Sequence, residues 1–147
     1  MSTELNKTLV RRFYEEVFNK KNLAIIDDFL DPHIIEHALP PGLPGGIQGS
    51  RQLIGMYLTA FPDLQLTAEA LIAEEDKLAA RLTMRGTHKG EFMGIPPTGK
   101  QVTMTGIQIV RIANGKIAEN WINLDALGLL QQLGVIPPLG QASSSPL

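Results

Sequence analysis

The chain has 147 residues, of which 44% are hydrophobic and 19% charged, with a net charge of −2 at pH 7 and no cysteine. This length predicts one domain that can bury a core, and the weak charge without a Lys/Arg cluster argues against a nucleic-acid-binding protein. The lack of cysteine excludes disulfides, thiolate nucleophiles and cysteine-bound metals. No apolar run reaches the length of a signal peptide or a membrane span, so we expect a cytoplasmic protein without membrane contact.

The first half of the chain predicts helices that are joined by short extended and loop segments. Apolar residues recur at i, i+3 and i+4 through residues 3–18, as in an amphipathic helix. Asp31-Pro32 ends the second helix, because the residue before proline is pushed out of the α region. Ser50 is the expected cap of the third helix. The expected segments are a helix over 3–18, a helix over 22–30, an extended piece over 33–38, a loop over 39–49 and a helix over 50–61.

The second half predicts antiparallel strands. Asn114-Gly115 stands between two β-rich runs, and Asn-Gly in that position is the strongest short-range hairpin signal. The loop over 89–99 carries Phe92, Met93 and Ile95, and such an apolar loop is expected to cover something. The expected segments are strands over 64–73, 78–88, 102–112 and 116–124, a helix over 126–133 and a tail over 135–147.

Helices followed by antiparallel strands indicate an α+β fold. The simplest arrangement packs the N-terminal helices into the concave face of a strongly bent, mostly antiparallel sheet, with a pocket between the two layers. We expect one domain over residues 1–134 and a flexible C-terminal tail over 135–147.

Asp125, His88 and His37 are candidate acid/base groups. Asp125 joins a strand to a helix, so it is either a helix N-cap with a lowered pKa or a half-buried acid with a raised pKa. His88 ends a strand whose apolar face points to the core, and its ring either faces a pocket or hydrogen-bonds loop backbone. The strand around His37 is too short to decide which way that ring points.

Metal and cofactor motifs are missing from the sequence. The histidine and carboxylate spacings match no metal-ligand pattern. No Gly-x-Ser-x-Gly elbow, phosphate loop or dinucleotide fingerprint occurs. The sequence therefore gives no support to a metal site, to nucleophilic serine chemistry or to a nucleotide cofactor.

Three stretches of the chain resemble the SnoaL-like polyketide (ester) cyclases. They are Asp31-Pro32-His33, the run GTHKGEFMGIPPTGK over 86–100, and residues 115–134 with Gly115-Lys116-Ile117, Glu119, Trp121, Asp125 and the final LQQLG. The resemblance implies the cone-shaped fold of the superfamily of nuclear transport factor two and ketosteroid isomerase. It also implies a homodimer, or a higher oligomer, that forms through the outer sheet face.

The resemblance further implies an intramolecular aldol condensation on a small, apolar, carbonyl-bearing polyketide ester, without a metal and without a cofactor. Asp125 would act as general base and then acid, and His88 and His37 would assist it. Because this superfamily hosts several functions, the alternatives are isomerase, dehydratase or hydrolase chemistry in the same pocket, or a non-catalytic small-molecule-binding dimer. The residues expected to line the pocket are Trp121, Phe92, Met84, Gln108, Asn123, Tyr57 and Tyr14.

Overall fold

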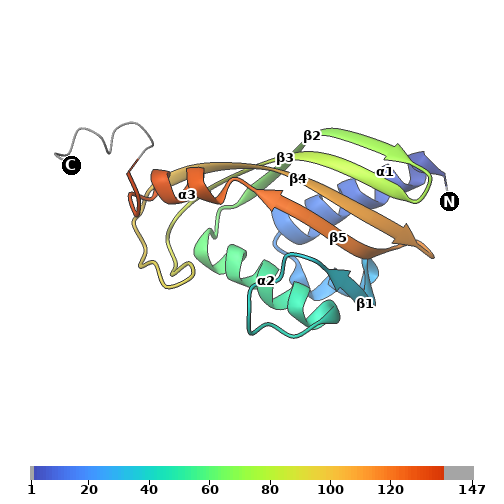
Figure 1. Ribbon diagram of the computed structural model, residues 1–147, viewed down its shortest axis with the longest axis horizontal. Coiled ribbons are helices and arrows are strands. Elements are labelled where there is room, and N and C mark those ends of the chain that lie inside the picture. Colours follow the sequence, from blue (N-terminus) through green and yellow to red (C-terminus); the bar gives the residue numbers. More distant parts are fainter. Residues whose placement is uncertain (1, 138–147) are drawn as a thin grey trace.

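The computed structural model describes residues 2–137, in which a helical N-terminal region is followed by a long, twisted sheet (Figure 1). In chain order the elements are α1 (Thr3–Phe13), the π-helical η1 (Tyr14–Asn19), the 3-10 helix η2 (Leu23–Asp28), β1 (Leu30–Glu36), α2 (Gly46–Ala60), β2 (Gln65–Glu74), β3 (Lys77–Thr87), β4 (Gln101–Ala113), β5 (Lys116–Leu124) and α3 (Ala126–Gln132).

The sheet has the strand order β1-β5-β4-β3-β2, in which β1 runs parallel to β5 and every other pair is antiparallel. Asn114 and Gly115 both have positive φ, as a type I′ hairpin turn requires, so the predicted hairpin is confirmed. Register shifts interrupt the pairs β1–β5, β2–β3 and β4–β5, and such irregularities bend the strands that carry them. The expected α+β architecture with a mostly antiparallel sheet is confirmed.

The helices cover one face of this sheet. α1 and η1 contact β2, and α2 contacts β1, so the hydrophobic core lies between the helices and the sheet (Figure 1). Val10 and Val17 are completely buried there, and Phe29 is 1% exposed. Among the described residues, no helix is both long enough and apolar enough to cross a membrane.

The largest differences from the predicted boundaries lie at three places, and the other boundaries shift by at most two residues. The first helix leaves the α form at Tyr14, where η1 begins. β1 begins at Leu30 and includes Pro32, which an edge strand tolerates because its outer N–H groups need no partner. α2 begins at Gly46, so Ser50 lies inside the helix and is not its cap. Burial of Ile47 explains the earlier start, since it anchors the extra turn in the core. Residues 138–147 of the expected tail lie outside the described residues.

Candidate active site

A cavity of about 540 Å³ lies between the helices and the inner face of the sheet. Its wall is mostly apolar, with side chains from α2, β3, β4 and β5 and from the loop after β3. A cavity of this size and character suits a drug-sized organic ligand. Five of the residues expected to line the pocket do so: Tyr14, Tyr57, Met84, Phe92 and Gln108.

The loop after β3 closes one side of the cavity. Phe92 pairs with Ile95 through two backbone hydrogen bonds, and the Phe92 ring packs on Tyr57 at a centroid distance of 5.2 Å. Phe92, Met93 and Ile95 all line the cavity. The prediction that this apolar loop covers something is confirmed.

One row of polar side chains crosses the otherwise apolar wall. Tyr14 Oη donates a hydrogen bond to Gln108 Oε1. Gln108 Nε2 donates to Asn120 Oδ1 at 2.7 Å, and Asn120 Nδ2 donates to Glu36 Oε2 at 3.0 Å. The parallel pairing of β1 with β5 places Glu36 directly beside Asn120, although the two residues are far apart in the sequence. These four side chains all line the cavity.

Among the described residues that line the cavity, Glu36 is the only one with a carboxylate. Burial raises the pKa of its carboxyl group, and the hydrogen bond from Asn120, the nearby Ser50 hydroxyl and the charge of His37 offset part of that rise. Ser50 is 3% exposed and also lines the cavity. Its hydroxyl makes no hydrogen bond of ordinary geometry within the described part of the chain.

The raised pKa of Glu36 makes stability depend on pH. The stability that this group contributes is fully present below the unfolded-state pKa, about 4.3, and is lost as pH rises through the higher folded-state pKa. Glu36→Gln is neutral throughout, so we expect its urea midpoint to exceed that of the wild type at about pH 8 and to approach it near pH 4. Urea unfolding across this range, followed by circular dichroism, measures the difference. Parallel pH profiles for the two proteins would contradict it.

The three expected catalytic side chains do not line the cavity. Asp125 is exposed, and its Oδ1 accepts a hydrogen bond from Gly128 N at 2.9 Å, which is the geometry of a helix N-cap. His88 is fully buried, and its Nδ1 accepts from the backbone N–H of Thr98 at 3.2 Å. The structure does not join Asp125, His88 and His37 by hydrogen bonds. Their catalytic assignment stays a prediction.

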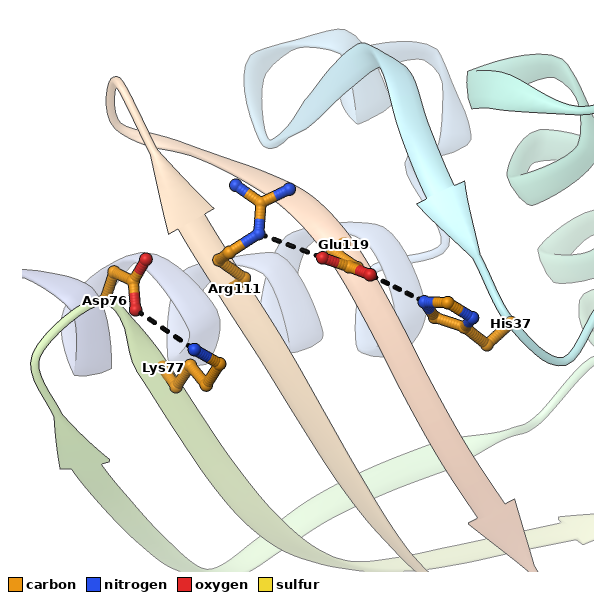
Figure 2. Close-up of polar contacts among 5 residues, drawn as sticks. All are labelled: His37, Asp76, Lys77, Arg111 and Glu119. Atoms are coloured by element: carbon orange, nitrogen blue, oxygen red, sulfur yellow. Dashed lines mark hydrogen bonds and ion pairs between the residues drawn. The ribbon is translucent and has the colours of Figure 1, made fainter.

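His37 lies on the outer face of the sheet. Its Nε2 is 2.6 Å from Glu119 Oε2, and Arg111 Nε donates to the other oxygen of Glu119 at 3.0 Å, as Figure 2 shows. The His37 ring stacks on Trp121 at a centroid distance of 5.0 Å. Trp121 and Asn123, both expected in the pocket, are absent from its wall. Side chains alternate along a strand, so Asn120 faces inward and Trp121 faces outward.

The N-cap geometry of Asp125 gives a stability prediction. We expect Asp125→Ala to lower the free energy of unfolding by about 0.5–2 kcal/mol, because the amide of Gly128 loses its acceptor. Asp125→Asn keeps an accepting oxygen and serves as the matched control, with most of the stability retained. Chemical denaturation of the three proteins measures both values. Equal losses in the two variants would show that charge, rather than capping, is what the position provides.

Within residues 2–137, no group of three or more His, Asp and Glu side chains is placed to hold a metal ion.

A profile of the SnoaL-like polyketide cyclases matches residues 8–133 of the chain. The chain belongs to the SnoaL-like polyketide cyclase family. It is 32% identical over 108 residues to nogalonic acid methyl ester cyclase of Streptomyces nogalater. This alignment covers 73% of this chain and 78% of that protein.

Other relatives and solved structures align over more of the chain. Aklanonic acid methyl ester cyclase DnrD of Streptomyces peucetius is 30% identical over 140 residues, or 91% of this chain and 92% of that protein. The structure of TsrD from Streptomyces laurentii superposes with a TM-score of 0.85 at 31% identity, over 92% of this chain and 99% of TsrD. A SnoaL-like polyketide cyclase from Agrobacterium tumefaciens superposes with a TM-score of 0.73 at 29% identity, over 91% of this chain and 100% of that protein. The family and the fold expected from the sequence are confirmed.

Proposed function

We propose that the protein is a cofactor-independent ester cyclase that closes a ring in a polyketide methyl ester by intramolecular aldol condensation. The observation that carries this proposal is the cavity, whose apolar wall is crossed by one polar row from Tyr14 to Glu36. An apolar wall folds a flexible substrate so that its reacting carbons meet. A base and hydrogen-bond donors are all that the aldol step needs, because it moves only protons and carbon–carbon electrons. The printed names of the relatives supply the substrate class.

Incubation with aklanonic acid methyl ester tests this function. We expect a product of unchanged mass and altered retention time, because ring closure by an aldol step is an isomerisation. A product lighter by one water would instead indicate a dehydratase. The free acid, in which water has replaced methanol so that the product is lighter by one CH2 group, would indicate a hydrolase. Recovery of unchanged ester, here and with nogalonic acid methyl ester, would contradict the proposal. Activity that survives exhaustive dialysis against a chelator supports independence from metals.

We also propose that the protein is a homodimer that pairs through the outer face of the sheet. Ile72, Ile107 and Ile109 are exposed on this face, and Trp121 lies opposite Ile109 on the neighbouring strand. Large apolar side chains gathered on one sheet face are typical of an interface. The expected cytoplasmic location stays a prediction.

Sedimentation velocity at micromolar concentration tests the dimer. We expect twice the chain mass for the wild type and a shift to the monomer for Ile107→Asp, because a carboxylate at the centre of the face would be desolvated on pairing. Leu5→Asp changes an exposed leucine on α1 in the same way and should leave the mass unchanged. A wild-type monomer under these conditions would contradict the dimer.

A further inference from the structure

The polar row in the cavity has a direction. The hydroxyl of Tyr14 donates to Gln108, the amide of Gln108 donates to Asn120, and the amide of Asn120 donates to Glu36. Every donor therefore points toward the carboxylate, which fixes the Glu36 side chain as an acceptor and orients it against the cavity wall. A base held in one orientation by neutral donors keeps its remaining lone pairs for a ligand.

A second polar group, the Ser50 hydroxyl, lies beside this carboxylate and lowers its pKa. Ser50 is 3% exposed and lines the cavity, and its hydroxyl makes no well-formed hydrogen bond within the described residues. A buried hydroxyl that is held so loosely is available to donate to a ligand. Glu36 and Ser50 thus place a proton acceptor and a hydrogen-bond donor next to each other in an apolar space.

We propose that Glu36 is the catalytic base and acid of the ring closure, and that the Ser50 hydroxyl binds the oxygen of the carbonyl beside the carbon that loses its proton. The inference rests on the proposed cyclase function. Glu36 takes the proton as the C–H bond breaks, and the electron pair moves onto the carbonyl oxygen to form an enolate. The enolate carbon then bonds to the second carbonyl carbon of the same molecule. The alkoxide so formed takes the proton back from Glu36, so the product is an isomer of the substrate.

The other groups near the cavity are less suited to this role. Of the described residues in its wall, only Tyr14, Tyr57 and Glu36 can exchange a proton, and burial raises the pKa of both phenols, which keeps them protonated as donors. His37 follows Glu36 in the chain but points to the outer face, where Glu119 binds it. The charge of His37 lowers the pKa of Glu36 without giving the ring access to the cavity.

Two measurements with aklanonic acid methyl ester test the inference. The first is ring closure, and the second is exchange of the ester's acidic carbon-bound protons in heavy water, followed by mass spectrometry, which reports the base step alone. We expect Glu36→Gln to slow both by about 10²–10⁴-fold, the contribution of a positioned acid/base group, with an unchanged circular dichroism spectrum. Glu4→Gln removes an exposed carboxylate from α1 and serves as the matched control, with both rates unchanged.

The outcomes separate this inference from the proposed function. Exchange that is equal in the wild type and in Glu36→Gln, or absent from both, overturns the role of Glu36. Exchange that depends on Glu36 while no ring closes supports Glu36 as a base and overturns the cyclase proposal. Loss of both rates in Asp125→Asn, with Glu36→Gln as fast as the wild type, would transfer the role to Asp125.

Ser50 and Asn120 give finer readouts. Ser50→Ala should lower kcat/KM about 2- to 10-fold, the effect of one neutral hydrogen bond to the oxygen that becomes the enolate. Asn120 is a positioning residue, because it acts through Glu36. Asn120→Leu removes the hydrogen bond that lowers the Glu36 pKa, so the rise of kcat/KM with pH should move to higher pH. If Asn120 served only packing, Asn120→Leu would lower kcat/KM without shifting the pH at which kcat/KM rises. That result would overturn the assignment of Asn120 as a positioning residue.

Discussion

Phe29→Ala is expected to lower the free energy of unfolding by about 3–5 kcal/mol, the cost of truncating a buried phenylalanine. Phe29 is 1% exposed and lies just before β1, where its ring packs against Phe13 at a centroid distance of 5.7 Å. The guanidinium of Arg12 also stands over this ring, 5.5 Å from its centroid. The substitution therefore removes aromatic contacts together with apolar burial, and it leaves a void that rigid neighbours fill only in part. Urea denaturation at fixed pH measures the loss.

The position of Phe29 explains why this change should affect stability more than ligand binding. Phe29 is absent from the cavity wall, so the void would open behind α1. Leu5→Ala, on the exposed face of α1, is the control and should change stability by less than about 0.5 kcal/mol. A loss below about 1 kcal/mol for Phe29→Ala would show that the helices and β1 are packed more loosely than this structure has them.

Local patterns in the sequence were sufficient to predict the architecture. Asn114-Gly115 fixed the last hairpin, because only residues that tolerate positive φ suit such a turn. Apolar residues alternate along β3 at Ala80, Leu82 and Met84, and this alternation indicates the inner face of the strand, where all three are buried. Boundaries were less predictable where tertiary burial decided them, as at Ile47, whose burial extends α2 by one turn.

The polar site was harder to predict because it depends on pairing between distant strands. Glu36 and Asn120 become neighbours only through the parallel alignment of β1 with β5, which no local pattern specifies. Asn120 does stand between Ala118 and Ile122 on one side of β5, and that alternation could have indicated the inner face. The opposite set contains Trp121 and Asn123, which do not line the cavity. The ring of His37 covers that tryptophan from outside the cavity.

Filling the cavity should abolish most activity without unfolding the protein. Ile122 projects from β5 into the cavity beside Gln108, its partner on β4, and is only half-buried because the space in front of it is open. Ile122→Trp places a bulky ring where the substrate must fold. We expect kcat/KM for aklanonic acid methyl ester to fall by about 10²-fold, because displacement of a reacting carbon by roughly 1 Å is enough for such a loss. Steady-state kinetics and a thermal melt measure the two effects.

Ile35→Trp is the matched control for this variant. Ile35 is exposed and points away from the cavity, between the inward-facing Ile34 and Glu36, so the same exchange there adds bulk only to the surface. Its kcat/KM should equal that of the wild type. Ile122→Ala enlarges the cavity instead, and should keep turnover while relaxing the choice between esters of different size. A folded Ile122→Trp protein with wild-type kinetics would show that the substrate binds elsewhere, and the assignment of this cavity as the reaction chamber would fail.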